Sequence, residues 1–296
     1  MQCQFSKKTR SSVFFIVCVL PLCFVLAKAQ ELCPSFATLK PSLQTDTVRW
    51  IPDGDTIHTH SGHKLRLLHI NAPEINPRST KPAEPLAKSA QHHLHQLVKP
   101  GQPIYWLPDV RSQDKYGRTL ALAFNEKGQF INSAMLTSGF AQLLVIPPNI
   151  MFVDCLQQAE QTARNKKAGL WQNNQFQPIA AKNLQYSSGF HQIQGTITEI
   201  RLTRSEFHFH LDHTLWVIIS KKDQPYFSPS SQKVKSMTTK SATFQSETVS
   251  LKQLQVGKKI ILRGYVYLNK GLRKIKLRHP AMIINLEQVK SEKNSF

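Results

Sequence analysis

Residues 53–74 (DGDTIHTHSGHKLRLLHINAPE) constrain the fold of this chain more than any other stretch. Asp53 and Asp55 flank a glycine that permits a tight turn. Residues 64–70 are mostly apolar and predict a strand, which ends before Pro73 and leaves Glu74 at its rim. Arg66 lies inside this apolar segment and therefore requires an anionic partner, because an unpaired charge away from water is costly.

These residue types together suit metal-assisted attack on a phosphodiester, which needs oxygen ligands, a fixed cation and a free carboxylate at one site. Each feature alone has a plainer explanation. An Asp-Gly pair is usually a hairpin turn, and a single arginine in a strand is usually exposed or paired in a salt bridge. The combination is what favours a functional site.

The stretch resembles the staphylococcal nuclease family, and the resemblance continues at residues 114–118 (DKYGR) and 168–171 (AGLW). It covers residues 45–171. The order of the motifs and the distances between Arg66, Glu74, Arg118 and Trp171 fit the family. The resemblance implies an α+β fold, a five-stranded OB-type β-barrel with three helices, and hydrolysis of DNA and RNA that depends on calcium.

The resemblance also implies a metal site formed by Asp55, the side-chain oxygen of Asn71 and the carbonyl of Ala72. The best-known family member carries Asp and Thr at the last two positions. Asn71 removes one negative charge, so we expect weaker calcium binding, and another divalent ion is compatible with the site. The change at Ala72 matters little if the ligand there is the backbone oxygen.

Glu74 is expected to act as general base or to orient the attacking water. Arg66 and Arg118 would stabilise the charge that develops on the phosphate. By the same resemblance, water attacks in line, the 5′ oxygen leaves, and 3′-phosphate ends remain. The residues expected to support Asp55 or to contact substrate are Asp53, Lys115 and Tyr116.

Residues 1–29 are typical of a secretory signal peptide: a basic start, an apolar run at 12–25, and Ala27-Lys28-Ala29 as a cleavage site. An uncleaved anchor is the alternative. Cleavage near Ala29 predicts a secreted or periplasmic protein, which we expect to be a monomer without a transmembrane segment. Two cysteines then remain, Cys33 and Cys155. Export favours a disulfide between them, and the alternative is one buried and one exposed thiol.

The first half of the chain contains apolar alternation and apolar stripes that predict an α+β domain at residues 30–171. The predicted strands are 50–51, 56–60, 64–70, 104–107 and 118–124, and the predicted helices are 86–98, 131–138 and 156–163. Residues 76–85 are rich in proline and predict a mobile loop beside the site. Residues 172–189 are rich in Gln, Asn and Ser and predict a linker.

Residues 190–290 predict a second all-β, OB-like barrel that binds nucleic acid. Its predicted strands are 192–202, 207–211, 215–220, 258–268, 272–277 and 282–286. A segment at 221–250, rich in Ser, Thr, Lys and Gln, predicts a disordered insertion. Alternating aromatic residues either stack bases or pack in the core; they are Phe207, Phe209, Tyr265 and Tyr267. The candidates for phosphate contacts are Arg263, Arg273, Lys274, Lys276 and Arg278.

The net charge of +20 favours a polyanionic partner, and residues 190–296 carry 18 basic against 7 acidic side chains. Nine histidines lie in three clusters and are interpreted as solvated strand and helix faces rather than as ligands of a transition metal: His58, His60, His63, His92, His93, His95, His208, His210 and His213. The leading hypothesis is an exported metal-dependent nuclease. A non-catalytic nucleic-acid-binding protein that retains the fold is the alternative, favoured by Asn71, and an envelope-associated structural protein is a third.

Overall fold

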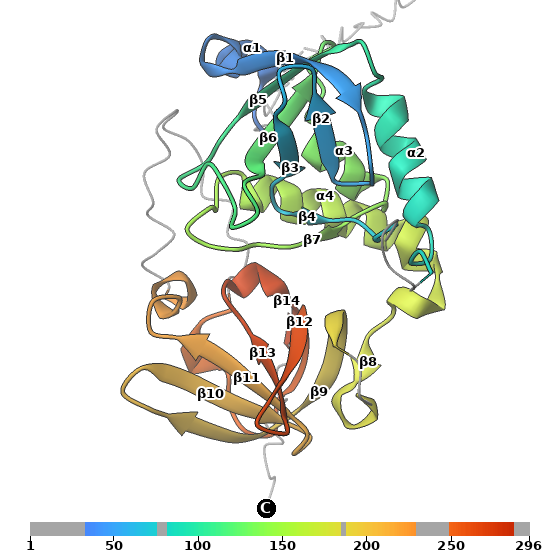
Figure 1. Ribbon diagram of the computed structural model, residues 1–296. Helices are drawn as coiled ribbons and strands as arrows, with labels where there is room; N and C mark the ends of the chain where they lie inside the picture. The colour runs from blue at the N-terminus through green and yellow to red at the C-terminus, as the bar shows by residue number, and fades with distance from the viewer. Residues whose placement is uncertain (1–32, 76–81, 185–187, 229–248, 287–296) are drawn as a thin grey trace, which may run out of the picture. The chain divides into compact units, whose positions relative to one another are not determined.

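A computed structural model describes residues 33–75, 82–184, 188–228 and 249–286 of the chain (Figure 1). Every described residue belongs to one compact unit. The predicted signal peptide at 1–29 lies outside the described residues. Within the described part of the chain, no helix is both long enough and apolar enough to cross a membrane.

Five strands of the first half form a closed barrel in the order β1-β2-β3-β6-β5 (Figure 1). These strands are β1 (Gln44–Trp50), β2 (Thr56–Thr59), β3 (Lys64–Leu67), β5 (Pro103–Leu107) and β6 (Thr119–Asn125). Strands β3 and β6 run parallel and the other neighbours are antiparallel. Apolar residues alternate inward and are fully buried, as at Ile57 and Leu65. The predicted five-stranded barrel is confirmed.

The predicted strand at 64–70 is in fact broken into two. Strand β3 ends at Leu67, and His69 follows with a φ of 61°, a left-handed conformation that no strand contains. The chain then continues as β4 (Ile70–Asn71), which pairs with β7 (Gln142–Leu143) outside the barrel. This break turns Asn71 away from the barrel ladder. Strand β1 also begins six residues before the predicted start at Trp50.

Three longer helices accompany the barrel, as predicted: α2 (Ala87–Leu97), α3 (Ile131–Thr137) and α4 (Val153–Asn165). Helix α2 buries Ala87, Ala90 and Leu94, which are spaced three or four residues apart on one face. Helices α3 and α4 pack against each other, and a short helix, α1 (Phe36–Leu39), precedes the first strand (Figure 1).

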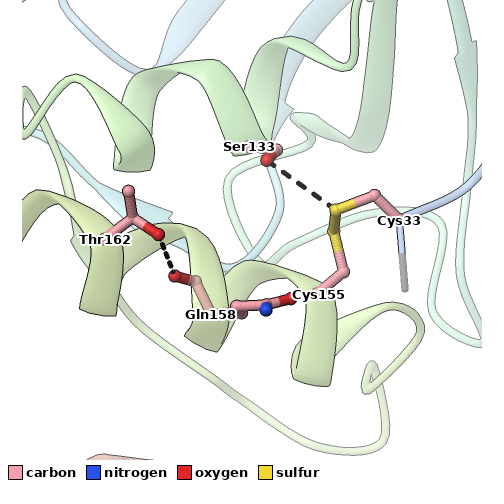
Figure 2. The surroundings of a disulfide bond; sticks show 5 residues. All are labelled: Cys33, Ser133, Cys155, Gln158 and Thr162. Carbon is pink, nitrogen blue, oxygen red and sulfur yellow. Dashed lines mark hydrogen bonds between the residues drawn. A yellow bond between two sulfur atoms is a disulfide. The ribbon is translucent and has the colours of Figure 1, made fainter. Parts of the chain in front are cut away.

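A disulfide joins Cys33 to Cys155, at the N-terminal end of α4 (Figure 2). The sulfur of Cys33 also lies 3.9 Å from the hydroxyl of Ser133 on α3. The structure thus has the predicted bridge in place of one buried and one exposed thiol. It closes a separation of 122 residues, for which the chain-entropy model gives about 5 kcal/mol of stabilisation.

Strands β8 to β14 form a second sheet in the order β14-β12-β13-β11-β10-β9-β8, and a further pairing of β12 with β9 closes five of them into a ring. The bounds are β8 (Ile179–Ala180), β9 (Gly189–Leu202), β10 (Glu206–Leu211), β11 (Leu215–Ser220), β12 (Lys259–Asn269), β13 (Leu272–Lys276) and β14 (Ile283–Leu286). The third and fifth strands of the ring, β11 and β13, run parallel, as β3 and β6 do in the first barrel.

Two segments predicted to lack structure contain ordered elements. In the predicted linker, β8 runs parallel to β9, and 3-10 turns lie at Asn174–Phe176 and Ala181–Asn183. In the predicted insertion, Gln224–Phe227 forms a 3-10 turn because Phe227 is buried. Residues 76–81 of the predicted loop and 229–248 of the insertion lie outside the described residues.

Candidate functional site

Asp55 stands at the start of β2 with its carboxylate buried against the loop that follows β4. Its Oδ2 lies 2.9 Å from Nη2 of Arg66 and accepts a 3.0 Å hydrogen bond from the Ala72 amide. Its Oδ1 accepts a hydrogen bond from the Thr56 hydroxyl at 3.2 Å. Asp53 accepts a hydrogen bond from the backbone amide of Asp55 at 3.0 Å.

Gly54 is required for a different reason from the one that the sequence suggests. Its backbone does not adopt a left-handed conformation. Instead, an added Cβ would lie 2.7 Å from the Cβ of Ala72 and 2.8 Å from the Cβ of Ala90 on helix α2. The glycine therefore lets the acidic loop approach both the β4 segment and α2, and so places Asp55 beside Ala72.

Arg66 has the anionic partner that its place in an apolar strand demands. Besides Asp55, its guanidinium binds two backbone carbonyls: Nη1 donates to Leu67 at 2.7 Å and to Ile70 at 2.9 Å. These carbonyls flank the turn at Leu68 and His69. The arginine therefore holds the break between β3 and β4 that carries Asn71 toward the site.

Asn71 has an unforeseen partner from the second barrel. The hydroxyl of Tyr265, on β12, donates to Oδ1 of Asn71 at 3.0 Å. Burial raises the pKa of Tyr265, so the hydroxyl keeps its proton. Oδ1 is the oxygen that the sequence assigns to the metal. A carbonyl oxygen has two lone pairs, so one remains for a cation. Sequence spacing could not reveal this contact, because 194 residues separate the two side chains.

Glu74 lies at the exposed rim of the site and is surrounded by charges. Its pKa is raised, first by partial burial and then by the negative charges of Asp55 and Glu84, while Arg66 and Arg118 act to lower it. The charges of Asp55, Arg66 and Arg118 thus all act on the Glu74 carboxylate. Glu84 was not predicted; its carboxylate accepts a hydrogen bond from the Glu74 amide at 3.1 Å.

Arg118 is held by the turn that precedes β6. The carboxylate of Asp114 accepts bonds from the backbone amides of Tyr116 and Arg118, at 2.9 and 3.0 Å, and from Nε of Arg118 at 2.8 Å. Tyr116 is 71% exposed, and both Lys115 and Arg118 place cations near its ring, at 4.9 and 5.6 Å from the centroid. This exposed cluster is open to a phosphate group.

The donor atoms at the site suit a hard divalent cation. Burial raises the pKa of Asp55 to about 6, with Asp53 contributing in the same direction, although Arg66 opposes the shift. The positive charge of Arg66 only partly offsets the cost of this burial, and a divalent ion would add further positive charge beside the carboxylate. The described residues contain no group of three or more His, Cys, Asp or Glu side chains suited to a metal, so carbonyls and water would complete the shell.

Arg263 does not fit its predicted contact with phosphate. It is 2% exposed, and its guanidinium forms a close ion pair with Glu160 of helix α4. Glu160 also pairs with Arg164 at 3.3 Å and accepts from the Leu143 amide at 2.8 Å. The two cations hold the pKa of Glu160 below its ordinary value despite burial. Arg263 is therefore a structural residue that ties β12 to α4.

The other predicted residues of the second barrel divide into core and surface. Phe207 and Phe209 are buried, so they pack in the core and do not stack bases. Lys274 and Lys276 lie on the surface side of β13. Arg273 alternates with them and lies opposite Leu215 on β11. Arg278 is bonded to Asp223, at 3.5 Å, and to the carbonyl of Pro147, at 3.0 Å.

Comparison with known proteins supports the resemblance for the first half of the chain. Residues 64–173 match the family model described as staphylococcal nuclease homologue. The thermonuclease of Staphylococcus hyicus is 30% identical over 133 residues, which are 44% of this chain and 77% of that protein. The SPbeta prophage-derived endonuclease YokF of Bacillus subtilis (strain 168) is 31% identical over 129 residues, 42% of this chain and 43% of the relative.

A further relative, endonuclease YhcR of the same Bacillus strain, is 29% identical over 134 residues, which are 42% of this chain but 11% of that protein. The chain thus spans most of the first relative and less than half of the other two. The family model ends at residue 173, before β8, so the second barrel lies beyond the matched region.

Proposed function

This chain belongs to the staphylococcal nuclease family, and from that premise we propose that it is an exported, metal-dependent nuclease that hydrolyses phosphodiester bonds of DNA and RNA. The observation that carries the proposal is the grouping of Asp55, Arg66 and Glu74. The carboxylate of Asp55 pairs with Arg66 at 2.9 Å, and both charges act on Glu74 at the rim. A protein that only bound nucleic acid would have no need of a carboxylate facing the phosphate.

Each side chain has a role that its surroundings support. Glu74, whose pKa is raised, would take the proton of the attacking water or orient that water. Arg66 and Arg118 would bind the phosphate with their planar donors and stabilise the added negative charge on its oxygens. Asp114 holds Arg118 through Nε, so the terminal nitrogens remain to face a phosphate.

The proposed metal ligands are Asp55, the side-chain oxygen of Asn71 and the Ala72 carbonyl, with calcium as the expected ion and another divalent ion as the alternative. When bound, the ion would polarise the phosphate and lower the pKa of a coordinated water. Asp53 would keep Asp55 in place, and Lys115 and Tyr116 would contact the substrate phosphate. The expected products carry 3′-phosphate ends.

The direct test is hydrolysis of single-stranded DNA, duplex DNA and RNA by the mature protein with calcium, with other divalent ions and with chelator. We expect cleavage that needs a divalent ion and yields ends that a polymerase extends only after phosphatase treatment. Cleavage that persists in chelator would contradict metal dependence. Ends that a polymerase extends directly would contradict the proposed product.

Export is proposed from residues 1–29 alone. Sequencing the N-terminus of protein recovered outside the cytoplasm tests it, and we expect a start near Gln30. A recovered chain that still begins at Met1 would favour an uncleaved anchor instead.

A non-catalytic nucleic-acid-binding protein is the second candidate, and one observation favours it: Oδ1 of Asn71 already accepts a hydrogen bond from Tyr265. Tight binding with no cleavage under any ion would support this candidate. In either case we propose that the second barrel binds nucleic acid as a linked site and so raises affinity for long substrates.

A further inference from the structure

One row of residues crosses five strands on the outer face of the second barrel and begins at Glu199 on β9, which lies opposite His210. The register pairs His210 on β10 with Trp216 on β11, Trp216 with Lys274 on β13, and Lys274 with Tyr267 on β12. Residues paired across a sheet share a face. The inner face is occupied by alternate residues such as Phe209 and Val217, which are fully buried. The row therefore faces outward.

Two members of the row form a stacked pair. The rings of His210 and Trp216 lie 4.2 Å apart between centroids with an interplanar angle of 4°. The guanidinium of Arg201, on β9, lies 4.9 Å from the Trp216 centroid. Both rings are partly exposed at the surface. Large flat rings beside exposed cations are the combination on which unpaired bases stack and to which phosphates bind.

The charge around the row is positive. Lys276 lies one row further along β13, opposite Ile218. Two carboxylates lie on the same face, and each has a partner: Glu199 pairs closely with Arg201, and Glu206 lies 2.7 Å from His208. In the described residues, the Lys274 ammonium group donates one side-chain hydrogen bond, to the neutral side chain of Asn269 at 3.1 Å. The face thus has cations in excess and suits an anionic chain.

We propose that the row His210–Trp216–Lys274–Tyr267, bordered by Arg201, is a binding site for single-stranded nucleic acid. Unpaired bases stack on the Trp216 and His210 rings, and Lys274 and Arg201 bind the flanking phosphates. Duplex DNA hides its bases, so it gains only the phosphate contacts there. This inference rests on the proposed function, because it takes the nucleic acid that the first barrel would cleave as the ligand of the second barrel.

The test measures binding without cleavage. The full chain carrying Glu74→Gln is titrated in chelator against a short labelled oligothymidylate and against a labelled duplex. We expect Trp216→Ala to weaken binding of the single strand by about 5- to 100-fold, the range for loss of one stacked base. Trp216→Phe keeps a ring and should retain most of the affinity. Duplex affinity should change little.

Trp50→Ala is the matched control, because Trp50 also contacts a histidine, His58, at 4.6 Å, and is 46% exposed, but lies on the first barrel. It should leave the affinity for the single strand unchanged. An unchanged affinity in Trp216→Ala, with a normal unfolding midpoint, would overturn the proposal. So would equal losses for single strand and duplex.

Lys274→Gln keeps the proposal testable if Trp216→Ala does not fold. Removing one phosphate contact should lower the slope of log affinity against log salt by about 0.7 for a single strand, and an unchanged slope would overturn the proposal. The proposed nuclease activity can fail separately: absence of cleavage in the unmutated chain would refute it, while a loss of binding in Trp216→Ala would still support the site.

Discussion

The two barrels of this chain share one strand order but differ in the side chains on equivalent strands. In each, the third and fifth strands of the ring run parallel, β3 with β6 and β11 with β13. In the first barrel this ladder holds Arg66, which pairs with a buried carboxylate, opposite Leu120. In the second it holds Trp216 opposite Lys274. The shared strand order supplies the positions, and we propose that the side chains on them suit the first barrel to hydrolysis and the second to binding.

A second difference lies in the loops. The first barrel has an acidic turn before β2 and a break after β3, which together bring Asp55 beside Ala72. In the second barrel, β10 and β11 are joined by a tight turn at Asp212 and His213, both in left-handed conformation. In the described residues, the turn between β10 and β11 has no counterpart of the pairing of Asp55 with Arg66 and the Ala72 amide that the first barrel builds from its loops.

The first prediction concerns Arg66, the cation that pairs with Asp55 in the first barrel. Arg66→Ala should lower turnover by about 100- to 1000-fold, the range for losing one donor to the charge of a transition state. Binding of single strands to the second barrel should persist. Arg49→Ala, an exposed arginine on β1, is the control. Steady-state cleavage and binding assays measure the two quantities, and a parallel loss of both would mean that Arg66 acts through the fold.

The second prediction concerns the ion pair that joins the barrels. Arg263→Met leaves Glu160 buried with Arg164 and the Leu143 amide as partners. We expect a loss of about 3 kcal/mol in the free energy of unfolding, the lower end for breaking a buried pair. Urea denaturation measures it. Adding Glu160→Met should restore part of the loss, and no recovery in the double variant would contradict the pairing.

The third prediction is a pH dependence of stability. Burial and the neighbouring His69 lower the pKa of His279 from 6.5 to about 4. The unfolded state therefore binds the proton more tightly, so stability is complete above pH 6.5 and falls as the pH drops toward 4. At pH 5 the loss should be about 2 kcal/mol from this group.

His279→Asn tests this dependence, because its side-chain oxygen can still accept the bond that the Ala281 amide makes to Nδ1 at 3.2 Å. Urea unfolding at a series of pH values should show a shallower decline in the variant than in the unmutated chain. Identical slopes would mean that His279 keeps an ordinary pKa in the folded protein.

The fourth prediction concerns Tyr265 of the second barrel, whose hydroxyl donates a hydrogen bond to Asn71 in the first. Tyr265→Phe removes the hydrogen bond to Asn71 but keeps the ring, which packs 5.3 Å from Phe190. We expect a change of about 1 kcal/mol in calcium affinity, the usual worth of one neutral hydrogen bond. Calcium titration by calorimetry measures it, with Tyr267→Phe as the control.

Much of this architecture follows from sequence patterns. Alternation located most strands of both barrels, although it predicted β1 only at its last residue, and the apolar strand around Arg66 required an anionic partner, which is Asp55. The predictions that failed depend on tertiary contacts, which sequence patterns do not show. The break at His69 depends on the carbonyls that Arg66 binds, and the burial of Arg263 depends on Glu160, 103 residues away. Likewise, Phe207 and Trp216 are both aromatic residues in alternating strands, and only the strand register shows that Phe207 lies in the core and Trp216 at the surface.

Whether Glu74 belongs to the catalytic centre is tested by comparing Glu74→Gln with Glu126→Gln. The second variant deletes an exposed carboxylate of the first barrel that accepts a hydrogen bond from Gln102. Turnover and oligonucleotide affinity are measured for each with saturating divalent ion. A general base predicts that Glu74→Gln lowers turnover by about 100- to 10,000-fold while affinity changes little, and that Glu126→Gln changes neither. Full turnover in Glu74→Gln would show that the grouping of Asp55, Arg66 and Glu74 is not the catalytic centre.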